Sequence, residues 1–368
     1  MSSILRASGV ESPYVEMEHD SLANLNDSDS IVLLILDGLG YKHLVENGSR
    51  TFLKENLKGS ITSVFPPSTS SAVTTYMTGL APQQHAVTGW WMYLREYGIV
   101  SRIMPFSSVI NYDPLGTDIS NVLNVRPLTH SARREYSIIS TANIIDSEFS
   151  RFMAGDGGRV GYSEMEGLFT CIEAVLGSSD NRKYVYAYWP SFDEVSHIVG
   201  NKSDEAKEIL GIFDNALREF VEKLGEHNVT LVITSDHGFV DVEKDNFLST
   251  KGHPKLEECL SHPICGDTRT SFCYVRPFKV DDFERYVSKN LSDACHLFRS
   301  DELVRENWFG LYEPNPRLHN RIGDYAMVYK ENYAMVSLFP GSEMPGLVGH
   351  HGGASEDEML VPLIVIEG

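Results

Sequence analysis

Three apolar, β-prone runs, each followed by a polar cluster that contains an aspartate, constrain the fold of this chain most. The runs cover residues 31–36, 184–189 and 229–234. Strands that are apolar on both faces lie in the middle of a parallel sheet that helices cover on each side. Between the last two runs, residues 203–224 carry apolar side chains with 3,4 spacing, and Gly225 follows as a stop signal. The order strand, helix, strand predicts a parallel crossover unit.

The rest of the chain suggests one large core with a smaller insertion. We expect residues 1–255 and 336–368 to form an α/β core, a doubly wound and mostly parallel sheet with helices on both faces. Residues 256–335 alternate short strand-like pieces with one helical stretch, which predicts a small α+β inserted lobe. Residues 1–29 are polar and mixed, and we expect a leader strand or loop there.

The composition limits the partners of the protein. The formal net charge of -20 repels phosphate backbones, so no nucleic-acid polymer is expected as a partner. A small phosphorylated substrate remains compatible, because bound cations reverse the field at one site. The five cysteines are an odd, scattered set without a CxxC motif, and no apolar run is long enough for a membrane span or a signal peptide. We therefore expect a cytoplasmic protein that does not bind membranes.

Residues of the types that bind metals follow the ends of the predicted strands. The carboxyl ends of parallel strands meet at one edge of a sheet, where ligands bind. Each of these residues alone fits an ordinary turn or surface pair, but several strand ends with aspartate and histidine together predict a site for zinc or manganese. The candidates are Asp37, Asp193 with His197, Asp236 with His237, and either His350 or His351.

A second feature is a run of hydroxyl residues before a short helix. Pro67 and Ser68 resist helix formation, whereas the apolar residues that follow repeat with helical spacing up to Gly79. Ser68, Thr69 and Ser70 are therefore expected at a helix N-terminus, where free N–H groups bind phosphate. A plain serine or threonine N-cap is the alternative.

Five segments together resemble the type I phosphodiesterase / nucleotide pyrophosphatase family of the alkaline phosphatase superfamily. Their order and spacing agree with the family pattern, and the resemblance extends from residue 31 to the end of the chain. It implies an alkaline-phosphatase-like fold. The segments are LILDG at 34–38, PPSTSSAVTTYMTGLAP at 66–82, WPSFDEVSH at 189–197, TSDHGF at 234–239 and GHHGG at 349–353.

The resemblance implies a hydrolase with two divalent metal ions, zinc or alternatively manganese, and a nucleophile at Thr69 that forms a phosphothreonine intermediate. His351 is favoured over His350 because the ligand of the family directly precedes the glycine pair. The implied ligands of one ion are Asp37, Thr69, Asp236 and His237, and those of the other are Asp193, His197 and His351.

The motifs leave the substrate open. A nucleotide or another phosphodiester fits the family, and a phosphomonoester or a phosphonate is the alternative. A binding protein that kept the fold and a metal without turnover is a further alternative. Candidate substrate contacts are Ser70, Trp90 and Arg269, with Arg321 as an alternative to Arg269.

Overall fold

The computed structural model describes residues 1–48, 50–128, 132–225, 228–339 and 343–368. Its core is a seven-stranded sheet with the order β2-β18-β9-β1-β8-β6-β7. Strands β9, β1, β8, β6 and β7 run parallel, whereas β18 is antiparallel to both β9 and β2. The strands are β1 (Ser30–Leu36), β2 (Leu57–Thr62), β6 (Glu135–Thr141), β7 (Gly158–Tyr162), β8 (Lys183–Trp189), β9 (Val229–Thr234) and β18 (Leu360–Glu367).

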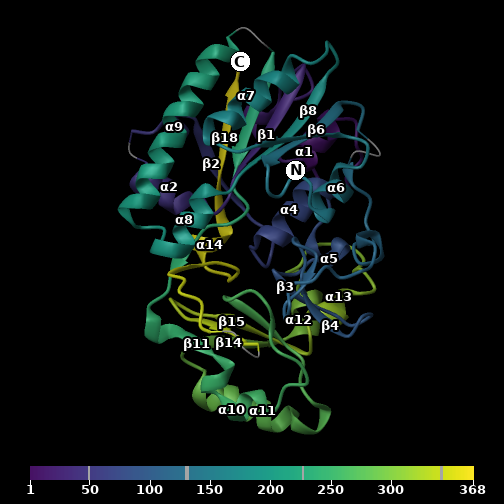
Figure 1. The fold of residues 1–368 in the computed structure, drawn as a ribbon, viewed down its shortest axis with the longest axis vertical. Coiled ribbons are helices and arrows are strands. Elements are labelled where there is room, and N and C mark those ends of the chain that lie inside the picture. Colours follow the sequence, from purple (N-terminus) through teal and green to yellow (C-terminus); the bar gives the residue numbers. More distant parts are fainter. Residues whose placement is uncertain (49, 129–131, 226–227, 340–342) are drawn as a thin grey trace.

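Helices cover both faces of this sheet, as Figure 1 shows. On one face α7 (Met165–Leu176) and α9 (Asp204–Leu224) pack on the sheet, and on the other lie α1 (Ser2–Ala7), α4 (Thr69–Thr78) and α6 (Glu148–Ala154). The Ser203 hydroxyl caps α9 by accepting the N–H of Ala206. The predicted fold class, a doubly wound and mostly parallel sheet, is confirmed.

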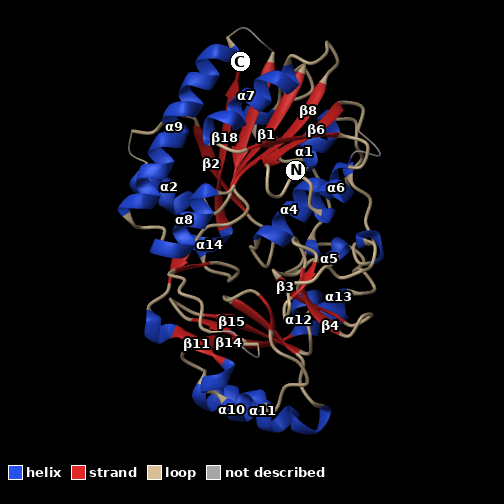
Figure 2. Ribbon diagram, in the orientation of Figure 1, coloured by secondary structure: helices blue, strands red, loops and turns tan. Residues whose placement is uncertain are grey.

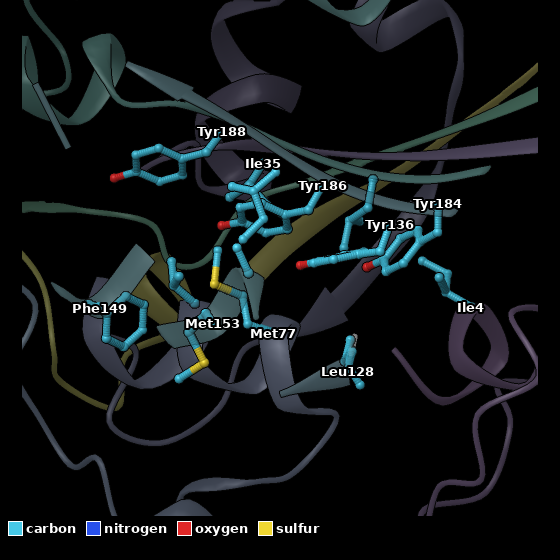
Figure 3. Packing of buried hydrophobic residues seen from close by; sticks show 14 of the residues in the cluster. Ile4, Ile35, Met77, Leu128, Tyr136, Phe149, Met153, Tyr184, Tyr186 and Tyr188 are labelled. Carbon is cyan, nitrogen blue, oxygen red and sulfur yellow. The ribbon is translucent and has the colours of Figure 1, made fainter. Parts of the chain in front are cut away.

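Strand β8 shows how the sheet reaches the functional edge. Tyr184, Tyr186 and Tyr188 alternate with smaller apolar residues, so all three lie on one face of the strand. They belong to the same buried cluster as Met77 of α4 and Met153 of α6 (Figure 3). The packing fixes α4 against the end of β8, which is where the site lies.

A second, antiparallel sheet lies below the first in the view of Figure 2. Its strand order is β14-β15-β13-β12-β3-β4-β5. The predicted lobe, residues 256–335, supplies the first four strands in this order, and the others come from residues 91–108, which the prediction left in the core. We propose that both segments form one lobe. The strands are β3 (Trp91–Leu94), β4 (Ile99–Arg102), β5 (Ser107–Ser108), β12 (Cys265–Gly266), β13 (Thr270–Cys273), β14 (Cys295–Arg299) and β15 (Tyr325–Tyr329).

Short elements connect the two sheets and cover their ends. They are α2 (Tyr41–Asn47), α3 (Phe52–Glu55), α5 (Pro82–His85), α8 (Ser191–Val199), β10 (Val240–Asp241), β11 (Phe247–Ser249), α10 (Pro254–Glu257), α11 (Val280–Asn290), α12 (Ser300–Arg305), α13 (Leu318–Arg321), β16 (Ala334–Val336), β17 (Gly349–His350) and α14 (Glu356–Met359).

One prediction about the N-terminal segment is wrong. Residues 1–29 were expected to form a leader strand or loop, but residues 2–7 form helix α1. Ile4 and Leu5 of α1 are buried in the core cluster of the parallel sheet. A helix of six residues is too short to show a recognisable helical pattern, so tertiary packing determines this element.

Candidate metal centre

The predicted metal ligands meet at the carboxyl edge of the parallel sheet. Because β8, β1 and β9 are neighbours in register, the segments that follow them start side by side. Asp37 follows β1, Asp193 lies on α8 directly after β8, and Asp236 and His237 follow β9. His351 follows the short strand β17, which pairs with β10.

His237 lies at the centre of the cluster. Its Nε2 atom is 3.3 Å from Asp37 Oδ1, 3.5 Å from Asp236 Oδ2 and 3.9 Å from Asp193 Oδ1. The same Nε2 is 3.2 Å from the hydroxyl oxygen of Thr69. Residues from three strand ends and one helix therefore converge on one point.

The second group of ligand types adjoins the first. The ring of His351 stacks on that of His237 with centroids 3.7 Å apart, and His197 Nε2 lies 3.4 Å from Asp193 Oδ1. Ligand atoms of Asp193, His237 and His351 lie within 4.8 Å of one another, as do those of Asp37, Asp236 and His237. All seven residues predicted to bind the two ions thus lie in one cluster.

The three imidazoles share one kind of backbone contact. The Nδ1 atoms of His197, His237 and His351 lie 2.9, 3.2 and 3.2 Å from the backbone carbonyls of Gly349, Gly238 and Pro67, respectively. A carbonyl only accepts, so in the neutral ring Nδ1 is the donor and Nε2 presents its lone pair to the cluster. Histidine ligands of metals are usually held in this way by a carbonyl behind the ring.

In the described part of the chain, each carboxylate in the cluster has a buried oxygen without a hydrogen-bond donor. Within the described residues, Asp37 Oδ1, Asp193 Oδ1 and Asp236 Oδ2 are buried and accept no hydrogen bond. Burial and then the negative charges of Asp193 and Asp236 raise the pKa of Asp37 well above its ordinary value. Burial also raises the pKa of Asp193, against the opposing effect of His197 and His237. These oxygens and free Nε2 atoms fit divalent cations, which satisfy both.

His351 and His350 have different environments. Burial and then the nearby His237 and His197 lower the pKa of His351 well below its ordinary value, so the ring is neutral, as a metal ligand must be. His350 is buried against Phe247, and its Nδ1 is 3.0 Å from the Thr268 hydroxyl. Within the described residues, the groups able to hold a metal ion include His351 and not His350.

Helix α4 presents Thr69 at its first position. Ser68 is the N-cap in extended conformation, and Gly79 ends the helix in the left-handed conformation with φ of 71°. The Tyr76 hydroxyl donates to the carbonyl of Ser235 at 2.7 Å, which ties α4 to the end of β9. Thr69 and Ser70 are buried, and the first N–H groups of a helix have no intrahelical acceptor. This N-terminus is therefore arranged to receive an anion beside the cluster.

A cavity of about 260 Å³ lies at Asp267, which accepts a hydrogen bond from Ser68, the N-cap of α4. Trp90, Trp91, Tyr112 and Asp267 are among the residues that line it. The Asp267 carboxylate accepts the N–H of Trp90 at 3.2 Å and the Ser68 hydroxyl. Burial raises the pKa of Asp267 to about 7 against the effect of these two hydrogen bonds. Asp267 thus connects the cavity wall to the N-cap of α4.

Arg269, predicted as a substrate contact, is fully buried, and all three of its guanidinium nitrogens donate to protein groups. Its guanidinium forms two hydrogen bonds with Glu358 and also donates to the carbonyls of Lys330 and Tyr333. Arg321, the alternative, is also buried and donates to Glu96 and two backbone carbonyls. We therefore leave both arginines out of the proposed substrate site.

Sequence reasoning missed two residues at the site. The Tyr188 hydroxyl donates to Asp37 Oδ2, and Asp267 supports Ser68. The alternation of tyrosines in β8 placed Tyr188 on a face of the sheet, but only the structure shows that its hydroxyl reaches Asp37. Asp267 lies in the predicted lobe, and no motif of the core pointed to it.

The fold and this cluster define a phosphoric ester hydrolase with a mostly parallel sheet between helices and with a candidate metal centre. The family profile of type I phosphodiesterase / nucleotide pyrophosphatase matches residues 31–354, and the chain belongs to this family. The family predicted from the motifs, and the prediction of an enzyme, are therefore confirmed. No protein with a curated description matches the chain.

Solved structures share the fold at low sequence identity. Murine ectonucleotide pyrophosphatase / phosphodiesterase 5 is 16% identical with a TM-score of 0.68, over 90% of this chain and 87% of the other. An inactive variant of that murine protein was solved in complex with AMP, at 17% identity, 90% and 87% coverage and a TM-score of 0.68. Phosphonoacetate hydrolase from Sinorhizobium meliloti, in complex with phosphonoformate, is 17% identical with a TM-score of 0.64, over 91% and 89% of the chains.

No helix within the described residues combines the length and the apolar character that crossing a bilayer requires.

Proposed function

We propose that the protein hydrolyses phosphodiesters, such as nucleotides with an organic group on each side of the phosphorus, and that Thr69 is the nucleophile. The observation that carries the proposal is the 3.2 Å distance between Thr69 Oγ1 and His237 Nε2 at the N-terminus of α4. A hydroxyl at this point lies beside both the phosphate-binding helix end and the cluster of ligand types.

The residues present fit two divalent cations, zinc or alternatively manganese. The fit rests on the three buried carboxylate oxygens without a hydrogen bond and on the three imidazoles with Nδ1 held by carbonyls. Cations held there supply Lewis-acid chemistry, which lowers the pKa of a hydroxyl and compensates the charge of the phosphate. Following the family pattern, we propose Asp37, Thr69, Asp236 and His237 for one ion, and Asp193, His197 and His351 for the other. Thr69 lies 3.2 Å from His237 Nε2, and His197 Nε2 lies 3.4 Å from Asp193 Oδ1.

The chain's own residues then account for the two halves of the reaction. Thr69 Oγ attacks phosphorus, the Thr69 proton passes to solvent, and the bond from phosphorus to one organic group breaks, so that this group takes a proton from solvent and leaves as an alcohol. Water next attacks the phosphothreonine and the bond from phosphorus to Thr69 Oγ breaks. One proton of the water restores the Thr69 hydroxyl, and the phosphomonoester of the second organic group is released. The N–H of Ser70, free at the start of α4, donates to a phosphoryl oxygen in both halves.

The cavity at Asp267 supports a substrate with an organic group. Its lining includes two tryptophans and Tyr112, whose faces accept a flat or apolar group. The AMP complex of the murine relative and the phosphonoformate complex of the bacterial one concern small phosphorus compounds, which agrees with this size of site. Phosphomonoesters and phosphonates remain the alternative substrates. A cytoplasmic location also stays a prediction, based on the odd set of cysteines.

The experiment is the release of nitrophenol from bis-p-nitrophenyl phosphate and from the corresponding monoester, with and without a chelator. We expect diester cleavage that chelation abolishes and that zinc or manganese restores. Faster cleavage of the monoester than of the diester would reject the proposal that the protein is a phosphodiesterase and would favour a phosphomonoesterase. Metal binding without turnover of either ester would instead support the non-catalytic alternative.

A further inference from the structure

One buried ion pair connects the lobe to the metal centre. Arg269 of the lobe and Glu358 of α14 both have side chains with no solvent exposure. Two hydrogen bonds join them: Arg269 Nε donates to Glu358 Oε1 at 3.2 Å, and Arg269 Nη2 donates to Glu358 Oε2 at 3.0 Å. A fork of this kind fixes both the distance and the orientation of its partners.

Glu358 also holds the loops of two proposed metal ligands. Its Oε1 accepts the N–H of Gly353, two residues after His351, at 2.7 Å. Its backbone carbonyl accepts the N–H of Gly238, the residue after His237, at 2.8 Å. Glu358 therefore forms hydrogen bonds with both loops, the one that carries His237 and the one that carries His351.

The packing around these contacts leaves little room for movement. A Cβ atom on Gly238 would lie 2.0 Å from the carbonyl oxygen of Asp357, and one on Gly353 would lie 2.7 Å from Glu358 Oε2. Real Cβ contacts are longer, so Gly238 needs to be glycine, and a side chain at position 353 would displace the Glu358 carboxylate. The close approach means that a shift of Glu358 moves both loops with it.

The two lobe residues before Arg269 also contact the loop that carries His351. The Thr268 hydroxyl lies 3.0 Å from His350 Nδ1, and a Cβ on Gly352 would lie 2.6 Å from the Cβ of Asp267. Three successive residues of the lobe, 267–269, thus contact the segment around His351 directly or through Glu358.

Stability alone does not account for a pair of this kind. Removing two charges from water costs free energy that their attraction often fails to offset, and apolar residues of similar volume frequently stabilise as well. A fork that fixes geometry has a clear use where ligands must be held at one separation.

We propose that Arg269 and Glu358 are positioning residues: their pair holds the His237 and His351 loops at a fixed separation and couples the lobe to the metal centre. The inference rests on the proposed function of the site. Neither side chain contacts the substrate or the reacting atoms; both act through the ligand loops.

The test uses two conservative variants at opposite ends of the pair, Arg269→Lys and Glu358→Gln. Arg321→Lys is the matched control, because Arg321 is equally buried and also donates to a glutamate, Glu96, but contacts neither ligand loop. For each full-length protein, Zn²⁺ is titrated into the metal-free form by calorimetry. Urea unfolding in chelator, and kcat and KM on bis-p-nitrophenyl phosphate, are measured in parallel.

We expect both variants to bind Zn²⁺ about 10- to 100-fold more weakly than the unmodified protein, as changes behind metal ligands do. We also expect kcat to fall while KM stays within about twofold, since alignment rather than substrate binding is affected. The control should lose stability in urea to a similar extent and keep its Zn²⁺ affinity. Because the variants alter different ends of the pair, either one that folds is sufficient.

Two results would overturn the inference, and they are distinguishable. If the unmodified protein binds Zn²⁺ and cleaves the diester, but the variants lose only stability and keep their affinity, the pair is merely structural. If the unmodified protein itself neither binds Zn²⁺ nor cleaves an ester, the proposed function fails and this inference fails with it.

Discussion

Replacing Asp37 by Asn should make the metal-free protein more stable and the metal-loaded protein less stable. Asp37 is buried beside the carboxylates of Asp193 and Asp236, and its Oδ1 accepts no hydrogen bond in the described structure. Asparagine has nearly the same shape and keeps an oxygen for the Tyr188 hydroxyl, which donates to Asp37. The substitution therefore removes one negative charge with little change in packing.

The distances give the magnitude of the effect. Ligand atoms of Asp37 and Asp236 lie within 4.8 Å of each other. Two like charges at this distance repel by about 3 kcal/mol at an effective dielectric constant near 20. With part of this relieved by protonation, Asp37→Asn should add about 1–3 kcal/mol to the free energy of unfolding in chelator at pH 8.

The pH dependence has a defined sign. The pKa of Asp37 in the folded protein is raised, so the folded state holds a proton that the unfolded state releases. No penalty exists below the ordinary pKa of 3.8, and stability is lost as the pH rises above it. The advantage of Asp37→Asn in chelator should therefore grow as the pH rises above 3.8, until Asp37 of the folded protein is also ionised.

The assay is urea unfolding of both proteins with chelator and with Zn²⁺. In Zn²⁺ at about 1,000 times its dissociation constant, the unmodified protein should gain about 4 kcal/mol. The Asp37→Asn variant lacks one ligand charge and should gain much less. If this variant is less stable than the unmodified protein in chelator, or if Zn²⁺ does not stabilise the unmodified protein, the reasoning is refuted.

Four further substitutions, at three positions, test other parts of the site. Thr69→Ala should abolish hydrolysis while Zn²⁺ still stabilises the fold, and Thr69→Ser should keep part of the activity; undiminished turnover by Thr69→Ala would exclude Thr69 as the nucleophile. Tyr188→Phe removes the hydroxyl that donates to Asp37 and should weaken Zn²⁺ binding about tenfold, measured by calorimetry; unchanged affinity would mean that this contact does not orient Asp37. Trp90→Ala should raise the KM for bis-p-nitrophenyl phosphate about fivefold, the equivalent of about 1 kcal/mol of stacking, with little change in kcat; an unchanged KM would place the organic group outside the cavity.

The central sheet could be predicted because its signals are local. The apolar runs became β1, β8 and β9 with boundaries within one residue, and the helix expected at residues 203–224 became α9. A strand that is buried on both faces requires a continuous run of apolar residues, and such a run can be recognised in a single sequence. The polar clusters come directly after neighbouring parallel strands, which end at the same edge of the sheet. This explains why the predicted ligands lie together.

The lobe and the contacts to the site could not be predicted in the same way. Strands β3–β5 join the sheet of the lobe across a large separation in sequence, and nothing local marks their partners. Arg269 was a candidate substrate contact, but it pairs with Glu358, which lies in the acidic run 356–358. That run has the composition of an exposed helix start. Pairing between distant charged residues is decided by tertiary structure and not by pattern.

The most direct test is a crystal structure of the protein grown with Zn²⁺, with the ions located by anomalous scattering. The account predicts two peaks about 3.5–4 Å apart, beside Thr69 Oγ1 and within bonding distance of the aspartates and histidines of the cluster. A single peak, peaks elsewhere, or ligands bound through His350 in place of His351 would contradict it.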